Sequence, residues 1–158
     1  MRVRVVGVVK LRFCLHMFLG EFGHTIDPKK RLAIPAKFRA ELGTRAVLTI
    51  GFDTCLSLYP MKEWEKLAEK LNSMPLSQPN ARSLARFMLS GAMEVELDNL
   101  GRVLLPDYLK DYAGLKKEAI VTGVFNRIEV WDKTKWRAYK QKAARNINMA
   151  KELGQLGI

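Results

Sequence analysis

The stretch Asp27-Pro28-Lys29-Lys30-Arg31-Leu32-Ala33-Ile34-Pro35 occurs again in the same chain as Asp98-Asn99-Leu100-Gly101-Arg102-Val103-Leu104-Leu105-Pro106. The Asp, the Arg and the closing Pro recur at one constant offset (27 and 98, 31 and 102, 35 and 106). Both copies then continue with a short segment that ends on Gly, at Gly43 and Gly114. Self-similarity at a fixed spacing shows that one supersecondary unit is used more than once. The sequence therefore predicts two copies of one unit, called copy one and copy two below.

The similarity continues beyond these glycines with one inserted residue. Gly51-Phe52-Asp53-Thr54 corresponds to Gly123-Val124-Phe125-Asn126, and two aromatic positions correspond as Tyr59 with Trp131 and Trp64 with Trp136. Each copy is thus expected to contain a further pair of strands and a closing helix after the repeated stretch.

The composition favours a globular protein with a polyanionic partner. The chain has 158 residues, 48% of them hydrophobic, which is enough for a core of ordinary size. Lys and Arg number 27 against 16 Asp and Glu, giving a net charge of +11. An excess of that size attracts polyanions over long distances, and nucleic acid is the leading candidate. Many basic proteins bind no nucleic acid, so the charge alone supports this assignment only modestly.

The amino-terminal residues and the cysteines give little information about targeting, metal binding or disulfides. Residues 1–16 are basic and apolar, but Lys10 and Arg12 interrupt the apolar run, so neither a signal peptide nor a membrane span is predicted. Our interpretation is that Met17 is the natural start and that residues 1–16 are an upstream artefact or a disordered arm. Cys14 and Cys55 lack the spacing of a zinc site or a disulfide framework, which fits a reducing cytoplasm.

Within each copy the residue pattern predicts strand, turn, strand, short helix, hairpin and helix. Residues at 22–26 and 93–97 alternate as in half-buried strands, and Pro35 and Pro106 are followed by short helices expected at 36–42 and 107–113. Strands are expected at 47–50, 56–58, 119–122 and 128–130, with the tetrads that begin at Gly51 and Gly123 as turns. Asp132 is a candidate N-cap for the last helix, whose positions 136, 139, 143 and 147 share one face.

The sequence contains few residues in patterns typical of catalysis. His16 and His24 are the only histidines, and neither lies beside a Ser or Cys in a nucleophile and base pattern. No phosphate-binding glycine motif is present. Glu94, Glu96 and Asp98 resemble an acidic metal cluster, but only the Asp has a counterpart in copy one. We therefore expect no enzyme activity, no metal and no cofactor.

The repeat preserves an Asp and an Arg four residues apart across a turn. Asp27 and Asp98 can accept backbone N–H groups and so shape the turn. Gly101 suits a left-handed position that Lys30 must adopt less comfortably in copy one. One interpretation is an ion pair that only stiffens the turn. The other assigns binding to the arginines, because a guanidinium on a protruding turn can contact phosphate oxygens or the O6 and N7 atoms of guanine.

These residues, with Phe18-Leu19-Gly20-Glu21 before them and the paired aromatic positions after them, resemble the MraZ family of transcriptional regulators. The resemblance covers residues 17 to about 150. It implies an α+β, mainly β fold with two tandem SpoVT/AbrB-like swapped-hairpin modules, related by a pseudo-two-fold axis and flanked by short helices. It also implies a ring-like homo-oligomer that binds direct repeats in the promoter of its own division and cell-wall gene cluster. Lys30 departs from the family pattern, which usually has Gly there.

The resemblance and the residues together assign the regions of the chain. Modules are expected at 21–63 and 92–135, a linker and helix at 72–91, and a basic helix or tail at 136–158, with residues 1–16 outside both modules. The resemblance implies that Arg31 and Arg102 contact double-stranded DNA, and Lys29 and Lys30 lie beside the first of them. Asp27, Asp98 and Gly101 are expected to position the turns.

Three functions remain open from the sequence. The first is a sequence-specific DNA-binding regulator in the cytoplasm, associated with the nucleoid and without membrane partners. The second is an RNA-binding protein, although RNA recognition usually relies on aromatic stacking, and the patterned aromatics here are at expected strand ends and helix faces. The third is an oligomeric scaffold that binds an acidic protein.

Overall fold

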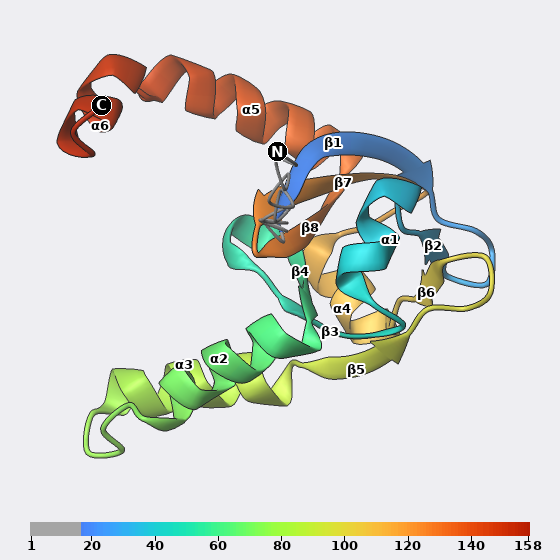
Figure 1. Cartoon of the computed structure of the whole chain (residues 1–158), viewed down its shortest axis with the longest axis horizontal. Helices are drawn as coiled ribbons and strands as arrows, with labels where there is room; N and C mark the ends of the chain where they lie inside the picture. Colours follow the sequence, from blue (N-terminus) through green and yellow to red (C-terminus); the bar gives the residue numbers. More distant parts are fainter. Residues whose placement is uncertain (1–16) are drawn as a thin grey trace, which may run out of the picture.

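Two antiparallel sheets organise the chain in the computed structural model, which describes residues 17–158 (Figure 1). The interpretation of residues 1–16 lies outside the described part of the chain. Copy one contains the elements β1 (Phe18–Thr25), β2 (Arg31–Ala33), α1 (Ala36–Leu42), β3 (Arg45–Ile50), the 3-10 turn η1 (Phe52–Thr54), β4 (Leu56–Pro60) and α2 (Met61–Asn72). A connecting helix, α3 (Pro79–Ser90), leads into copy two.

Copy two repeats the order of strands and helices of copy one, without the 3-10 turn and with one further helix at its end. It contains β5 (Met93–Glu96), β6 (Arg102–Leu104), α4 (Asp107–Ala113), β7 (Glu118–Phe125), β8 (Arg127–Asp132), α5 (Lys133–Asn146) and α6 (Met149–Gln155). The predicted sequence of strands and helices is therefore confirmed. β1 begins before residue 21, and α5 extends beyond residue 135.

The two short helices begin and end where the repeated Pro and Gly residues place them. Pro35 and Pro106 precede the first turns of α1 and α4, because Pro needs no N–H partner there. Gly43 and Gly114 follow the last turns with φ of 79° and 61°, backbone values that a residue without Cβ adopts readily. The bounds expected from the sequence for both helices are confirmed.

The copies exchange strands, so each sheet contains strands from both copies. The six-stranded sheet has the order β1-β7-β8-β4-β3-β5, in which the first strand of each copy pairs with the other copy. The copies meet at the centre through β4 and β8, where Ser57 lies opposite Glu129. The second sheet consists of β2 and β6 alone, again one strand from each copy. Paired β-strands thus join the copies at four places: β1 with β7, β3 with β5, β4 with β8, and β2 with β6.

The core is continuous across both copies. Leu32 and Val103 face each other on β2 and β6, and both are fully buried. The ring of Phe38 on α1 packs edge-on against Phe18 and Phe22 of β1, with centroid separations of 5.4 Å in both cases. Burial of each large apolar side chain contributes about 1.5–3 kcal/mol, so the exchanged strands are fixed by packing as well as by hydrogen bonds.

The hairpin formed by β7 and β8 differs from the turn expected from the sequence. The tetrad after Gly51 does form a turn, but residues 123–125 lie in β7 and only a tight turn at its end reverses the chain. The reason is the length of the neighbouring strand. The eight residues of β1 pair with β7 to its end, where Phe18 lies opposite Phe125, whereas the shorter β5 pairs only with the first residues of β3.

The remaining helices project from the body on the side opposite the β1–β2 and β5–β6 connections (Figure 1). Asp132 caps α5 by accepting the N–H groups of Thr134 and Lys135, as predicted. Of the positions expected on one face of this helix, 136, 139 and 143 lie in α5, whereas Ile147 follows its last residue. Trp136 and Tyr139 cluster with Trp131, but α5 contains no buried residue. Within residues 17–158, no helix is long and apolar enough to cross a bilayer.

A glycine in β7 allows the close approach of β1 and provides a test of the exchanged pairing. A Cβ atom at Gly123 would overlap the backbone of Phe18 and Leu19. Gly123→Ala should therefore reduce the free energy of unfolding by about 1–3 kcal/mol, the cost of an overpacked site. Denaturant melts of the full chain measure this loss. The control is Gly154→Ala in α6, where a Cβ has open space; equal stability of the two variants would contradict the packing described here.

Candidate functional site

The repeated Asp and Arg close a compact turn in copy one, called turn one (Asp27–Arg31). Asp27 accepts the backbone N–H of Arg31 at Oδ1 (2.9 Å) and the Nε–H of the same Arg at Oδ2 (2.7 Å). The backbone closes the loop as well, since the N–H of Asp27 donates to the carbonyl of Arg31 and the N–H of Lys30 to that of Asp27. One carboxylate thus fixes both the turn and the direction of the guanidinium.

The equivalent turn in copy two, called turn two (Asp98–Arg102), has the same hydrogen bonds. Asp98 accepts the backbone N–H of Arg102 at 2.9 Å and its Nε–H at 2.8 Å. It also accepts the N–H of Leu100 at 3.0 Å. Since the two turns differ at all three positions between Asp and Arg, the shared geometry depends on the Asp and the Arg themselves.

The short β2–β6 ladder places the two turns beside each other. Arg31 lies opposite Leu104 and Arg102 lies opposite Ala33, so the arginines are diagonal neighbours on adjacent strands. The Nη1 atom of Arg102 is 3.9 Å from Oδ2 of Asp27 in the other turn. Arg31 and Arg102, which are far apart in the sequence, therefore belong to one surface.

Both turns need one residue with left-handed backbone geometry, and the two copies meet this need differently. Lys30 has φ of 62° and Gly101 has φ of 71°, which confirms the expectation that Lys30 adopts the position of the glycine. Gly101 lies against the guanidinium of Arg39, whose Nε–H donates to the carbonyl of Ile34 at 2.8 Å. Lys30 instead forms an ion pair with Asp107 at the start of α4.

The carboxylates of both turns are held in the charged form. The backbone N–H of Arg31 lowers the pKa of Asp27, and the side chain of the same Arg lowers it further. The backbone N–H of Arg102 and then its side chain lower the pKa of Asp98 in the same way. The arginine side chains remain 32% and 25% exposed. A guanidinium held by its Nε–H in this way can present its other N–H groups to an anion or a base edge.

The other predicted residues of the site differ in their surroundings. Lys29 is exposed at the tip of turn one and makes no ion pair within residues 17–158. Turn two has the exposed Asn99 and Leu100 at the equivalent positions. The sequence analysis missed Arg39 and Asp107, which support the left-handed positions. Both residues could have been considered from the sequence, because they belong to the short helices that directly follow the two repeated stretches.

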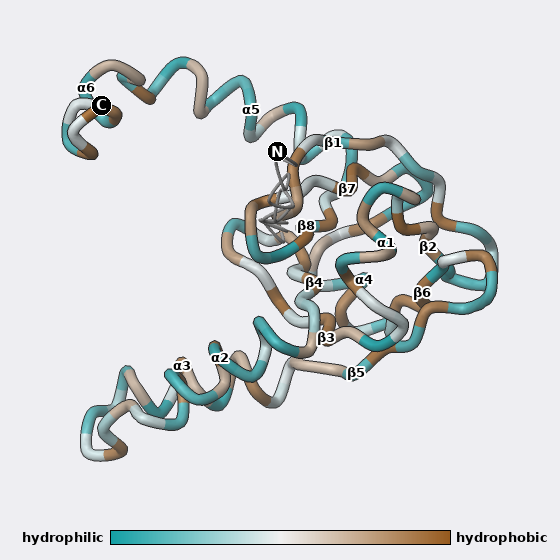
Figure 2. The backbone as a smooth tube through the Cα atoms, viewed as in Figure 1, coloured by the Kyte–Doolittle hydropathy of each residue, from teal (hydrophilic) through white to brown (hydrophobic). Residues whose placement is uncertain are grey.

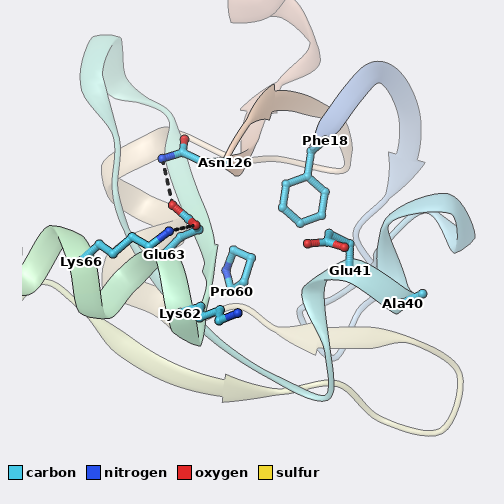
Figure 3. A pocket seen from close by; sticks show the side chains of 8 residues that line it. All are labelled: Phe18, Ala40, Glu41, Pro60, Lys62, Glu63, Lys66 and Asn126. Carbon is cyan, nitrogen blue, oxygen red and sulfur yellow. Dashed lines mark hydrogen bonds and ion pairs between the residues drawn. The ribbon is translucent and has the colours of Figure 1, made fainter. Parts of the chain in front are cut away.

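A hollow of about 300 Å³ lies away from the turns, between β1, α1, α2 and the β7–β8 turn (Figure 3). Glu63 accepts from Lys66 at 2.8 Å and from the amide of Asn126 at 3.5 Å in this hollow. Its described lining contains no His, Cys or Ser. The paired charges form a local ion network, and nothing in this lining resembles a nucleophile with its base.

The described part of the chain offers little other reactive chemistry. Burial raises the pKa of the Cys55 thiol to about 12, so this side chain stays protonated and unreactive near neutral pH. Burial and the neighbouring Arg39 lower the pKa of His24. Among residues 17–158, no group of three potential ligands from His, Cys, Asp and Glu could hold a metal ion.

Comparison with known proteins gives a consistent set of relatives. The family model described as "MraZ protein, putative antitoxin-like" matches residues 17–87 and 88–155, one match for each copy. A protein named Transcriptional regulator MraZ from Natranaerobius thermophilus is 49% identical over 90% of this chain and all of its own length. Proteins of the same name from Clostridium acetobutylicum and Pelotomaculum thermopropionicum are 49% and 53% identical over 90% and 81% of this chain. The match covers 100% and 88% of these two relatives.

The two left-handed positions predict unequal tolerance of a side chain. Gly101→Ala should destabilise the fold by about 1–2 kcal/mol, because the left-handed backbone is unfavourable for residues with Cβ and the new methyl group would displace Arg39. Lys30→Ala is the matched comparison, since the backbone there already carries a Cβ at φ of 62°. Denaturant melts measure both variants. A loss for Lys30→Ala as large as that for Gly101→Ala would be inconsistent with this role of the glycine.

The lowered pKa of each turn carboxylate predicts a specific loss of stability in acid. A carboxyl group whose pKa is lower in the folded protein stabilises the fold above its unfolded pKa of about 3.9, and this contribution disappears as the pH falls through the folded pKa. The double variant Asp27→Asn/Asp98→Asn keeps an oxygen acceptor in each turn but cannot titrate there. Its stability should therefore fall less than that of the original chain between about pH 5 and about pH 2.

Denaturant melts at a series of pH values measure this difference. The matched control is Asp111→Asn on α4, since Asp111 makes no ion pair within the described residues. This control should retain the full acid dependence. An identical acid dependence for the double variant and the original chain would show that the two turns contribute nothing to it.

Proposed function

Because this chain belongs to the MraZ family, we propose that it regulates transcription by binding double-stranded DNA through turn one and turn two. The observation that carries the proposal is the pair of arginines, each held at Nε by its own Asp and both placed on one surface by the β2–β6 ladder. The relatives compared above are named as transcriptional regulators. The net charge of +11 supplies the attraction that a basic protein needs to approach DNA.

In this proposal the residues of the two turns have distinct roles. Arg31 and Arg102 contact phosphate oxygens or the acceptor edge of guanine, for which a planar guanidinium has the right geometry. Lys29 adds an exposed positive charge beside Arg31, and Lys30 contributes charge while its ion pair with Asp107 fixes the turn. Asp27, Asp98 and Gly101 position the arginines. The structural role of each Asp and a binding role of each Arg are compatible, because the same hydrogen bonds serve both.

We propose that the fold is a fused pair of AbrB-like swapped-hairpin modules, at 21–63 and 92–135. The exchange of β1 and β5 between the copies supports this assignment, as does the central pairing of β4 with β8. The residues at 72–91 and 136–158 then serve as a connector and a basic extension. In such an arrangement a single chain supplies both halves of one DNA-binding unit.

Self-association into a ring-like homo-oligomer is part of the same proposal. Large apolar side chains remain exposed on the helices that project from the body. Along the backbone of these helices, hydrophobic and hydrophilic residues alternate (Figure 2). On α3, α5 and α6 these side chains are Leu84, Phe87, Leu89, Tyr139, Met149 and Leu153. Apolar surface of this kind favours association with a partner, and a second copy of the chain is the partner that a multivalent regulator requires.

Several linked subunits would explain how two small turns achieve specific binding. After one subunit binds, each further contact on the same DNA is intramolecular and takes place at high effective concentration. Repeated elements in a promoter provide the matching array of sites. We propose direct repeats upstream of the chain's own division and cell-wall gene cluster as the target, with the protein in the cytoplasm at the nucleoid.

RNA is the competing nucleic acid, and the residues of the turns favour DNA over it. Single-stranded RNA is usually recognised by stacking its bases on aromatic side chains. Neither turn contains an aromatic residue, and the repeated Tyr59 and Trp131 are buried. Competition of a labelled duplex by single-stranded RNA distinguishes the two, because an RNA-binding protein would release the duplex at low RNA concentration.

The arginines provide the direct test of the proposed site. Arg31→Ala and Arg102→Ala should each weaken binding to a duplex from upstream of the chain's own gene by about 1–3 kcal/mol per lost base contact. Because the backbone N–H bond to each Asp is kept, both variants should remain folded, and gel shifts and thermal melts together separate binding from folding. Unchanged affinity in both variants would remove these residues from the DNA-binding site.

Multivalent binding makes a separate prediction about the DNA. A duplex with two or more correctly spaced repeat elements should bind far more tightly than a duplex with one element, because the second contact is intramolecular. Binding should also weaken steeply with salt, as expected for neutralised phosphates. Gel shifts with matched duplexes of equal length measure both effects. Comparable affinities for one and for two elements would exclude the multivalent mechanism, and a flat salt response would favour the acidic protein partner.

A further inference from the structure

The surroundings of turn one differ from those of turn two. An open groove of about 580 Å³ runs along turn one, and its lining includes Lys110 from α4 and Lys116 and Lys117 from the α4–β7 connection. Asp27 and Pro28 form part of its wall. Lys116 and Lys117 are exposed, and none of the three lysines makes an ion pair within residues 17–158. Three positive charges thus lie in one groove at the edge of the proposed DNA-binding surface.

The acidic groups that lie closest to the groove along the chain, Asp27 and Glu118, are already paired with other cations. Asp27 is bonded to Arg31, and Glu118 forms an ion pair with Lys133 at 2.9 Å. The ion-pair partners Lys30 and Lys133 lower the pKa of Asp107 and Glu118 respectively, and Lys110 and Lys117 lower these two pKa values further. Because both carboxylates already form ion pairs with other lysines, the groove keeps an excess of positive charge. Concave surfaces lined by charges of one sign concentrate the field and attract counter-ions, of which a polyanion is the most strongly held.

A backbone hydrogen bond fixes the groove to turn one. The N–H of Ile26, immediately before Asp27, donates to the carbonyl of Lys117 at 2.8 Å. The equivalent bond at turn two runs from Leu97 to Thr44 at 2.9 Å. This correspondence identifies which residues of copy one take the positions of the lysines.

Turn two has fewer positive charges without an ion pair at those positions. Thr44 takes the place of Lys117, and Arg39 takes the place of Lys110 at the repeat offset of the sequence. The Nε–H of Arg39 is bonded to the carbonyl of Ile34, and the nearby Arg45 forms an ion pair with Glu94. The repeat thus preserves the two arginine turns but places three lysines that make no ion pair within residues 17–158 beside only one of them.

We propose that Lys110, Lys116 and Lys117 form a second DNA-binding surface, a groove that holds the sugar-phosphate backbone beside turn one and that turn two lacks. This inference rests on the proposed function and extends the interface beyond the repeated turns. Lysine ammonium groups bind phosphate as point charges without reading bases. The groove therefore adds affinity that is independent of sequence, and its presence on one side gives each subunit a fixed direction on the duplex. Such a direction suits repeats in direct orientation.

The double variant Lys116→Ala/Lys117→Ala of the full chain tests the proposal. It should weaken binding by the same factor, roughly 10-fold or more near 0.1 M salt, for a duplex from upstream of its own gene and for an unrelated duplex. The slope of log affinity against log salt should become shallower by about 2 for each bound subunit. The backbone bond from Ile26 is kept in this variant, so the melting temperature should not change.

The matched control is Lys142→Ala/Lys151→Ala, which removes the same charge from exposed positions on the projecting helices α5 and α6. The groove is rejected if its variant and this control have the same affinity and the same salt slope. The variant Arg31→Ala distinguishes failure of the groove proposal from failure of the proposed DNA-binding function. If Arg31→Ala weakens binding while the lysine variant does not, only the groove is wrong; if the unaltered chain binds no duplex, the proposed function fails with it.

Discussion

The pairing of β2 with β6 is the constraint on which the site depends. Each of these strands has only three residues, yet the fully buried Leu32 and Val103 face each other between them. Because the strands come from different copies, the site exists only when both copies are folded together. The exchange of β1 and β5 stabilises this arrangement on either side, since each copy completes the sheet of the other. An internal repeat thus becomes one surface rather than two separate modules.

The duplication also allows the two halves to differ. Asp and Arg are kept in both turns, where they make the same hydrogen bonds. Around them, Gly101 packs against Arg39 in one copy, whereas Lys30 forms an ion pair with Asp107 in the other. A symmetric pair of turns would bind DNA equally well in both directions, so any preference for one direction must come from these surroundings.

Much of the fold could be predicted from the residues because the repeat marks its own elements. Pro35, Pro106 and the two following glycines defined α1 and α4, and Lys30 was expected in a left-handed conformation that the structure confirms. The partners of the strands could not be predicted from local pattern, since exchange between copies is a long-range property. Gly123, Val124 and Phe125 became part of β7 for the same reason, because pairing with the distant strand β1 extends β7.

Hydrogen–deuterium exchange of the full chain, with and without a duplex from upstream of its own gene, tests the central claim most directly. The claim is that turn one and turn two form a single DNA-binding surface on the side opposite the projecting helices (Figure 1). The account predicts that DNA slows exchange in peptides covering residues 27–31 and 98–102 together, with little change in α2. Protection confined to α5 and α6, or to only one of the two turns, would contradict it.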